Sequence, residues 1–255
     1  MNETKIFDLL SRFGMEVPVT SWKPFGTGHI NDTFLIVTPE RVPDLILQRK
    51  NHLVFKNVPG MMDNIVKVTG HIRKKLMASG EAEIDRRVMH YIPAPDGPYF
   101  IKDDEGNFWT LFLFVRGSHG VEEVTSRGQA FSAGKAFGHF QRQLADLPGA
   151  LLIETIPGFH NGKGRLQQFR EAVDQDKARR VKEMKPYIDR LMEMAGEMTR
   201  LQEWLDTGLL PLRTTHNDTK INNVLFDENG EILCIIDLDT VMPGSALFDF
   251  GDAIR

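Results

Sequence analysis

Residues 215–223 read THNDTKINN and residues 235–239 read IIDLD, and these two short segments carry most of the information about the fold. Between them, the turn sequence DENG separates two β-prone runs, which predicts a tight β-hairpin. Asp218 and Asn223 stand five positions apart before this hairpin, and Asp237 follows its second strand directly. The sequence therefore predicts a polar loop before the hairpin and an acidic residue after it.

This arrangement has the residue types that phosphoryl transfer requires. The reaction needs a carboxylate that orients the attacking hydroxyl and accepts its proton, and oxygen ligands that hold Mg²⁺ on the phosphates of ATP. Asp218 has the position of the base in a kinase catalytic loop, and Asn223 and Asp237 have the positions of its metal ligands. An Asp and an Asn in one loop would mean little alone, but their combination with His216, the hairpin and IIDLD is much rarer.

These segments resemble the aminoglycoside phosphotransferase and choline kinase superfamily, in which a run like FDFGD at 248–252 opens a helix. Within the superfamily, the similarity is greatest to bacterial N-acetylhexosamine 1-kinases. It extends over GTGHINDTF at 26–34, LQR at 47–49, VFKN at 54–57 and ETIPGFH at 154–160. The resemblance implies an α+β, protein-kinase-like fold with two lobes.

The resemblance also implies an activity. The enzyme would be a small-molecule kinase that transfers phosphate from ATP, with Mg²⁺, to the anomeric hydroxyl of N-acetylglucosamine or N-acetylgalactosamine. Asp218 would accept the proton of that hydroxyl, and Asn223 and Asp237 would hold the metal ion. The implied partner is a small-molecule sugar.

Hydrophobic patterning agrees with two lobes. Up to about position 116 the chain reads as strands and turns with one helix, over 61–79, and a hairpin around DDEGN. Helices are predicted from about 126 and over 166–181 and 188–205. We expect a β-rich, nucleotide-binding N-lobe at 1–116 and a helical C-lobe at 117–255. Because chains of this superfamily continue with further helices, the resemblance implies a C-lobe that is incomplete at its end.

The nucleotide is expected to contact a glycine-rich loop between two predicted strands, at Gly26, Thr27 and Gly28. The cationic partner of the phosphates is expected at Arg49, with Lys50 as second choice, and a shift of one residue in register would turn Arg49 to solvent. No glutamate begins the next helix, where Asp63 is the nearest acidic residue, so the acidic partner of this cation stays open. The strand at 111–115 has the position where such kinases bind adenine through the backbone.

The sugar is expected to meet polar residues where the subfamily resemblance is densest, at His29, Asn31 and Asp32. Asn31 and Asp32 are equally consistent with a turn stabilised by their side chains. His160 and Arg165 form a second candidate patch.

Three further residues are expected to support the site. His216 is expected to brace the catalytic loop. Asp239 is expected either to contact a second metal ion or to make a structural hydrogen bond. Asp249 is expected to cap the following helix or to brace the catalytic loop.

Composition limits the binding partners and the cellular compartment that we expect for the protein. The formal net charge of −4 gives no reason to expect nucleic acid or an anionic membrane as a partner. The single cysteine, Cys234, lies in an apolar run and suits a reducing compartment. Since the N-terminus lacks the apolar core of a signal peptide and no run is long enough to span a bilayer, we expect a cytoplasmic protein. Nothing in the sequence indicates an oligomeric state.

Two alternatives stay open. One is a kinase of the same superfamily that acts on choline, homoserine or an aminoglycoside. The other is a truncated nucleotide-binding module with little activity. A screen of acceptors by ADP release would show which molecule is phosphorylated, and this result would distinguish these alternatives from the sugar kinase.

Overall fold

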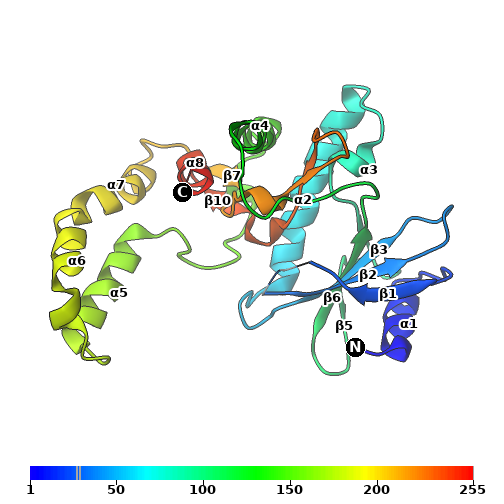
Figure 1. The fold of residues 1–255 in the computed structure, drawn as a ribbon, viewed down its shortest axis with the longest axis horizontal. Helices are drawn as coiled ribbons and strands as arrows, with labels where there is room; N and C mark the ends of the chain where they lie inside the picture. Colours follow the sequence, from blue (N-terminus) through cyan, green and yellow to red (C-terminus); the bar gives the residue numbers. More distant parts are fainter. Residues whose placement is uncertain (27, 29, 255) are drawn as a thin grey trace.

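The computed structural model describes residues 1–26, 28 and 30–254, which form a sheet-containing half and a mainly helical half (Figure 1). Within these residues, the main sheet has the strand order β1, β2, β3, β6 and β4, and β5 also pairs with β6. All neighbouring strands in it are antiparallel. The strands are β1 (Ser21–Pro24), β2 (Asp32–Val37), β3 (Leu45–Lys50), β4 (Tyr91–Ile92), β5 (Ile101–Lys102) and β6 (Phe108–Leu113).

The two faces of the sheet are covered by two helices, α1 (Glu3–Arg12) and α2 (Val58–Ala78) (Figure 1). Side chains of a strand point alternately to its two faces. Accordingly, Leu45 and Leu47 of β3 pack in the core that contains α1, whereas Ile46 packs in the core that contains α2. The sheet is thus buried on both sides, and its β3 strand is fixed in register by both cores.

The helix α1 was not predicted from the sequence. Its residues Ile6, Leu9 and Leu10 are buried against the sheet, and the side chain of Asn2 accepts a hydrogen bond of 2.9 Å from the backbone of Lys5. A helix of 10 residues is marginal in isolation, so its stability comes from packing of this apolar face. The signal was present as apolar residues at helical spacing behind a capping Asn.

The helix α2 confirms the prediction over 61–79 and begins slightly earlier, where Asn57 accepts a hydrogen bond of 3.0 Å from the backbone of Gly60. One polar residue on its inner face, Asn64, is completely buried. Its amide nitrogen donates to the carbonyl oxygens of Ile153, at 2.8 Å, and Val241, at 2.9 Å. These bonds attach α2 to the backbone at residue 153 and to the segment that follows residues 235–239.

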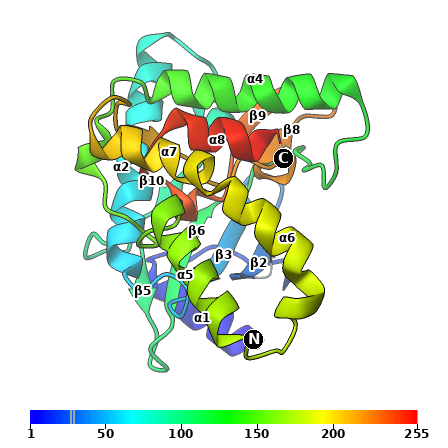
Figure 2. The same ribbon diagram turned by 90° about the vertical axis from the view of Figure 1, so that its left-hand side faces the viewer.

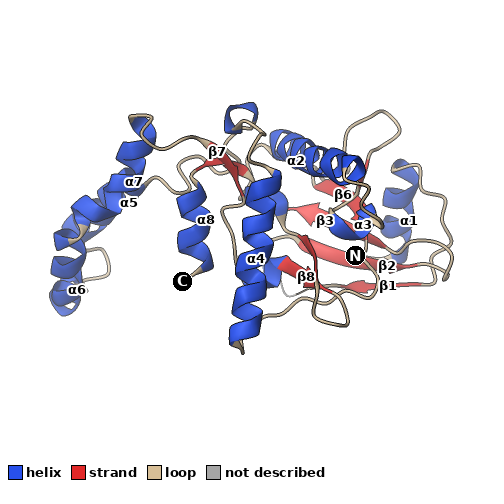
Figure 3. Ribbon diagram, turned by 90° about the horizontal axis from the view of Figure 1, so that it is seen from above, coloured by secondary structure: helices blue, strands red, loops and turns tan. Residues whose placement is uncertain are grey.

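The helical half contains α4 (Arg127–Gln143), α5 (Gly162–Gln175), α6 (Val181–Glu193), α7 (Ala195–Asp206) and α8 (Ala246–Ala253). The helices expected from about 126 and over 166–181 are confirmed with shifted ends, but the helix expected over 188–205 is two helices that meet at Met194. The helices α4 and α8 lie between the sheet and α5 to α7, which project outward (Figures 2 and 3). None of the helices in the described ranges combines the length and apolar character that a membrane crossing needs.

The predicted hairpin is confirmed as β8 (Val224–Phe226) and β9 (Ile232–Ile235), with Gly230 of its turn at φ +80°. A second small pair joins β7 (Arg213–Thr215) to β10 (Met242–Gly244). The remaining short elements are α3 (Ile84–Arg87), η1 (Gly149–Leu151), η2 (Ile221–Asn223) and η3 (Leu238–Thr240). The catalytic-loop residues thus lie between β7 and β8, and the IIDLD segment runs from β9 into η3.

Candidate active site

A cavity of about 740 Å³ lies between the main sheet and the β8–β9 hairpin. Apolar side chains from both sides line one part of it, including Ile46, Tyr91, Phe112, Leu225 and Ile236. Charged and amide side chains line another part: Lys50, Asp218, Lys220, Asn223, Asp237 and Asp239. The cavity therefore joins an apolar slot to a polar end, and the structure brings together the three residues on which the sequence interpretation rested.

Asp218 and Asn223, which stand five positions apart in the chain, are in direct contact. The amide nitrogen of Asn223 donates to the backbone oxygen of Asp218 at 2.8 Å and to its Oδ2 at 3.0 Å. The ammonium group of Lys220 also lies 3.0 Å from Oδ2 of Asp218. Sequence reasoning missed Lys220, although it stands two positions after Asp218 in the same loop. The loop therefore presents a carboxylate, an amide and a cation to one cavity.

His216 contacts both the catalytic loop and the end of β9. Its Nε2 donates to the backbone oxygen of Ile236 at 3.0 Å, and its Nδ1 accepts from the backbone nitrogen of Asp218 at 3.3 Å. The ring is buried and packs edge-to-face against Phe137 and Phe140 of α4. His216 thus links the loop of Asp218 to the strand end before Asp237.

Asp249 anchors the same loop from α8. Its side chain is buried, and its carboxylate accepts hydrogen bonds from the backbone nitrogens of His216, at 3.0 Å, and Asn217, at 2.7 Å. The amide of Gln141 donates to it as well, at 3.1 Å. Of the two expected roles, the geometry supports bracing of the catalytic loop.

We predict that Asp249→Ala destabilises the fold. Each buried backbone N–H left without an acceptor costs roughly 1–3 kcal/mol, so the loss of two such bonds should lower the free energy of unfolding by about 2–6 kcal/mol. Urea unfolding followed by circular dichroism measures this, with Asp104→Ala as the matched change at an exposed position. A difference from the wild type below about 0.5 kcal/mol would contradict the bracing role.

Lys50 supplies a second cation to the cavity. Its side chain is 1% exposed, and its Nζ donates to Oδ1 of Asp239 at 2.5 Å and to Oε1 of Gln48 at 2.5 Å. The expectation for Arg49 is corrected: Arg49 does not line this cavity, and its Nε donates to Oδ2 of Asp32 at 2.6 Å near the surface. The reason is the alternation of β3, which turns Gln48 and Lys50 inward and Arg49 outward.

The acidic partner of this lysine comes from the helical half of the chain. Asp63, the acidic residue nearest the start of α2, points outward and pairs with Lys67 at 2.6 Å. Asp239 takes the role instead, and its second oxygen accepts from the amide of Asn31 at 2.8 Å. Of the two roles considered for Asp239, the geometry therefore favours the structural one. Asn31, expected to meet the sugar, supports Asp239.

The other residues that were expected to bind the nucleotide or the sugar differ in their position relative to the cavity. Gly26 and Gly28 line the cavity, and Gly26 has φ +83°, a conformation that favours glycine. Thr27 and His29 lie outside the described residues. Asp32 does not line the cavity, because it faces Arg49 across neighbouring strands.

The second candidate patch lies beside the catalytic loop. The ring of His160 stacks on that of Phe248 with a centroid distance of 4.7 Å. Burial lowers the pKa of His160, while a hydrogen bond with the backbone of Asn217 acts in the opposite direction. A guanidinium nitrogen of Arg165 donates to the backbone oxygen of Phe159 at 3.4 Å. Neither His160 nor Arg165 lines the 740 Å³ cavity.

The polar end of the cavity suits a divalent cation. Asp237 has the left-handed backbone conformation, at φ +59°, directly after β9. Its pKa is raised, first by removal from water and then by the neighbouring carboxylate of Asp239, while Lys50 acts in the opposite direction. Since Asp218 engages the amide nitrogen of Asn223, the amide oxygen remains a possible ligand. Among the described residues, no three His, Cys, Asp or Glu side chains cluster as a metal cage, so a cation here would need ligands from a bound phosphate, as Mg²⁺ usually has.

The chain has a sheet-bearing half, a helical half and a cavity between them, and a braced Asp-x-x-x-x-Asn loop lines this cavity. Together these features define a phosphotransferase of the protein-kinase-like fold. The chain belongs to the phosphotransferase enzyme family known as APH, which residues 21–255 match. It is accordingly an enzyme, a phosphotransferase.

Several solved structures have the same fold. Spectinomycin phosphotransferase APH(9)-Ia, in complex with ADP and spectinomycin, is 13% identical with a TM-score of 0.53, and the match covers 98% of this chain and 72% of that one. The complex of APH(2″)-IIIa with GDP and kanamycin is 15% identical with a TM-score of 0.56, over 98% and 76% of the chains. Choline kinase LicA from Streptococcus pneumoniae is 12% identical with a TM-score of 0.56, over 99% and 73%. These similarities confirm the two-lobed α+β fold.

Proposed function

We propose that this enzyme transfers the γ-phosphate of ATP to the anomeric hydroxyl of N-acetylglucosamine or N-acetylgalactosamine. The observation that carries the proposal is the contact between Asp218, Asn223 and Lys220 at the polar end of a cavity large enough for a nucleotide. The choice of sugar rests on the sequence resemblance to N-acetylhexosamine 1-kinases over 26–34 and 154–160.

The nucleotide is proposed to occupy the cavity with its base in the apolar slot. Ile46, Tyr91 and Phe112 of the sheet face Leu225 and Ile236 of the hairpin across this slot. The segment after β6, which leads from the expected N-lobe at 1–116 to the C-lobe at 117–255, also lines it. Base recognition through that backbone segment would place the phosphates toward Lys50 and the glycine loop.

The phosphates are proposed to meet two cations of the chain. Lys50 is held in place by Asp239 and Gln48, so it is oriented before the nucleotide binds. Lys220 is half exposed and lies beside Asp218, where negative charge moves during transfer. Asn223 and Asp237 would hold Mg²⁺, which neutralises charge on the phosphates when bound.

Asp218 is proposed to orient the acceptor hydroxyl and take its proton. Its carboxylate is fixed by Asn223 and paired with Lys220, and the loop behind it is held by His216 and Asp249. A carboxylate fixed in this way lowers the entropic cost of alignment between acceptor and phosphate. The acceptor would enter from the Asp218 side of the cavity.

The proposal is tested by ADP release with Mg·ATP and five acceptors: N-acetylglucosamine, N-acetylgalactosamine, choline, homoserine and kanamycin. We expect ADP above background only with the N-acetylhexosamines, and a product whose ³¹P signal couples to the anomeric proton. The analogue of N-acetylglucosamine that lacks the anomeric hydroxyl is the matched control and should release no ADP.

Each other outcome has a defined meaning. ADP release with choline, homoserine or kanamycin would replace the sugar by that acceptor. A phosphate on another sugar hydroxyl would correct the position. Binding of Mg·ATP without ADP release for any acceptor would favour the nucleotide-binding module with little activity.

A further inference from the structure

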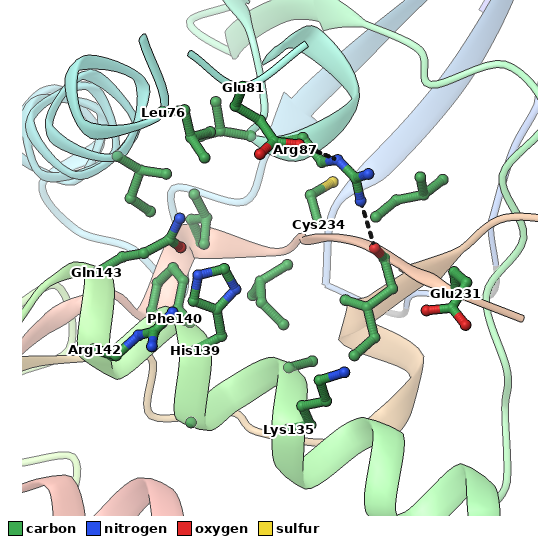
Figure 4. A pocket seen from close by; sticks show the side chains of 18 residues that line it. Leu76, Glu81, Arg87, Lys135, His139, Phe140, Arg142, Gln143, Glu231 and Cys234 are labelled. Atoms are coloured by element: carbon green, nitrogen blue, oxygen red, sulfur yellow. Dashed lines mark hydrogen bonds and ion pairs between the residues drawn. The ribbon is translucent and has the colours of Figure 1, made fainter. Parts of the chain in front are cut away.

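A second cavity, of about 580 Å³, lies between α2, α4 and the strand β9. It shares no lining residue with the nucleotide cavity. Leu76 of α2 lies on one side of the cavity, α4 forms the opposite wall, and the strand β9 crosses between them (Figure 4). The expected phosphotransfer chemistry uses none of its lining residues, so this cavity requires a separate explanation.

The α4 wall carries three basic side chains on one helical face. Lys135, His139 and Arg142 are spaced at i, i+4 and i+7, and all three line the cavity and are exposed (Figure 4). Among the described residues, these side chains have no hydrogen bond or ion pair. Basic side chains gathered without partners at the rim of a cavity favour an anionic ligand.

The other charged residues at the cavity are arranged differently. Arg87 pairs with Glu81 at 3.5 Å and donates to the backbone oxygen of Ile232 at 2.8 Å, so these two charges are largely internal to the wall. Glu231 lies at the far end of the cavity from Arg142 (Figure 4). The pKa of His139 is lowered, first by burial and then by Arg142, while Glu81 acts in the opposite direction. The α4 side of the cavity thus has a positive field.

The inner wall of the cavity is apolar. It is formed by buried residues: Ile72, Leu76, Val88, Ala136, Phe140, Leu233, Cys234, Ile235 and Leu238. Burial raises the pKa of Cys234 to about 12, so the thiol is neutral and contributes an apolar surface. A ligand with only a charged group would leave this surface in contact with water.

We propose that this cavity binds a small organic anion, with its apolar body against the inner wall and its carboxylate, sulfonate or phosphate group against Lys135 and Arg142. The volume falls within the range of small-molecule sites. We further infer that its occupancy is coupled to the nucleotide cavity, because the two cavities share structural supports.

Two sets of lining residues connect the second cavity to the supports of Asp218 and Asp237. Phe140 lines the second cavity and packs against the ring of His216, which braces the catalytic loop, at a centroid distance of 5.7 Å. Ile235 and Leu238 line it as well and stand on either side of Asp237 in the chain. A ligand that moves either support would therefore change the positions of Asp218 or Asp237.

Binding is tested with a matched pair of fluorescent probes. The first is 8-anilinonaphthalene-1-sulfonate, an apolar anion, and the second is N-phenyl-1-naphthylamine, which has the same apolar body without the sulfonate. We expect Lys135→Gln with Arg142→Gln to raise the Kd of the sulfonate about two- to thirtyfold, the range that corresponds to the loss of two exposed ion pairs. The Kd of the neutral probe should be unchanged.

Two further variants locate the site. Lys177→Gln with Lys182→Gln removes two exposed charges elsewhere and should leave both Kd values unchanged. Gly138 lines the cavity, and a Cβ there would meet no atom within 4 Å, so Gly138→Leu should fit the helix and weaken binding of both probes. If the double glutamine variant of α4 binds the sulfonate as the wild type does, the proposed anion site is wrong.

The coupling between the two cavities is tested by the effect of the probe on nucleotide affinity, a measurement that needs no phosphate acceptor. The Kd of Mg·ADP is measured by calorimetry in the wild type and in the double glutamine variant of α4, without the sulfonate probe and with it at one fixed concentration that just saturates the wild type. We expect a change of about fivefold or more in the wild type and a smaller one in the variant. Equal changes in both proteins, or none in the wild type, would overturn the coupling.

Discussion

Asp218→Asn is expected to lower the turnover number by about 10²–10⁴-fold, the usual contribution of a positioned general base. The amide keeps the size of the carboxylate and can still accept a hydrogen bond from Asn223, which lies 3.0 Å from Oδ2 of Asp218 in the wild type. The bracing bonds to His216 and Asp249 come from backbone nitrogens of the loop and do not depend on the Asp218 carboxylate. The Kd of Mg·ATP should therefore change by less than about threefold.

The measurement is steady-state ADP release with the acceptor that gives the highest rate, together with calorimetric binding of Mg·ATP. Asp104→Asn is the matched control, because it makes the same chemical change at an exposed turn. A turnover number within tenfold of the wild type would remove Asp218 from the role of base. A loss of turnover together with a loss of ATP binding would indicate damage to the loop.

The residues of the catalytic loop could be predicted from sequence because their geometry is local. Asp218 and Asn223 meet through a short loop, and the hairpin that follows is fixed by a turn of characteristic sequence. Local spacing of this kind leaves few possible arrangements. The same reasoning could have identified Lys220, which stands in the same loop and pairs with Asp218 at 3.0 Å.

Long-range partners could not be predicted in this way. The choice between Arg49 and Lys50 depended on the register of β3, and a shift of one residue exchanges the two faces of a strand. The register is set by Leu45 and Leu47 packing on the side of α1, a helix that the sequence interpretation missed. Without that helix, the outward direction of Arg49 could not be derived.

The acidic partner of Lys50 also depended on tertiary structure. Protein kinases pair the corresponding lysine with a glutamate of the next helix, but here α2 provides the buried amide of Asn64 instead. Asn64 holds the backbone at Val241, and the same segment supplies Asp239 to Lys50. The ion pair therefore joins the sheet to the IIDLD segment directly.

Lys50→Met is expected to lower kcat/KM for ATP by about 10²–10³-fold, as loss of one preorganised charge does in other enzymes. Arg49→Met is the matched control one residue away, and it should change kcat/KM by less than about threefold, because Arg49 pairs with Asp32 near the surface. The two variants thus separate the inward face of β3 from the outward face. The opposite order of effects would reinstate Arg49 as the phosphate ligand.

Loss of Lys50 also leaves the buried carboxylate of Asp239 without its cation, which should cost about 3–5 kcal/mol of folding stability. A second variant, Lys50→Met with Asp239→Asn, removes the charge and keeps the amide contact with Asn31 possible. We expect this double variant to recover most of the free energy of unfolding and none of the lost kcat/KM. Recovery of both would show that Lys50 acts through folding alone, whereas recovery of stability alone would assign it to the bound phosphates.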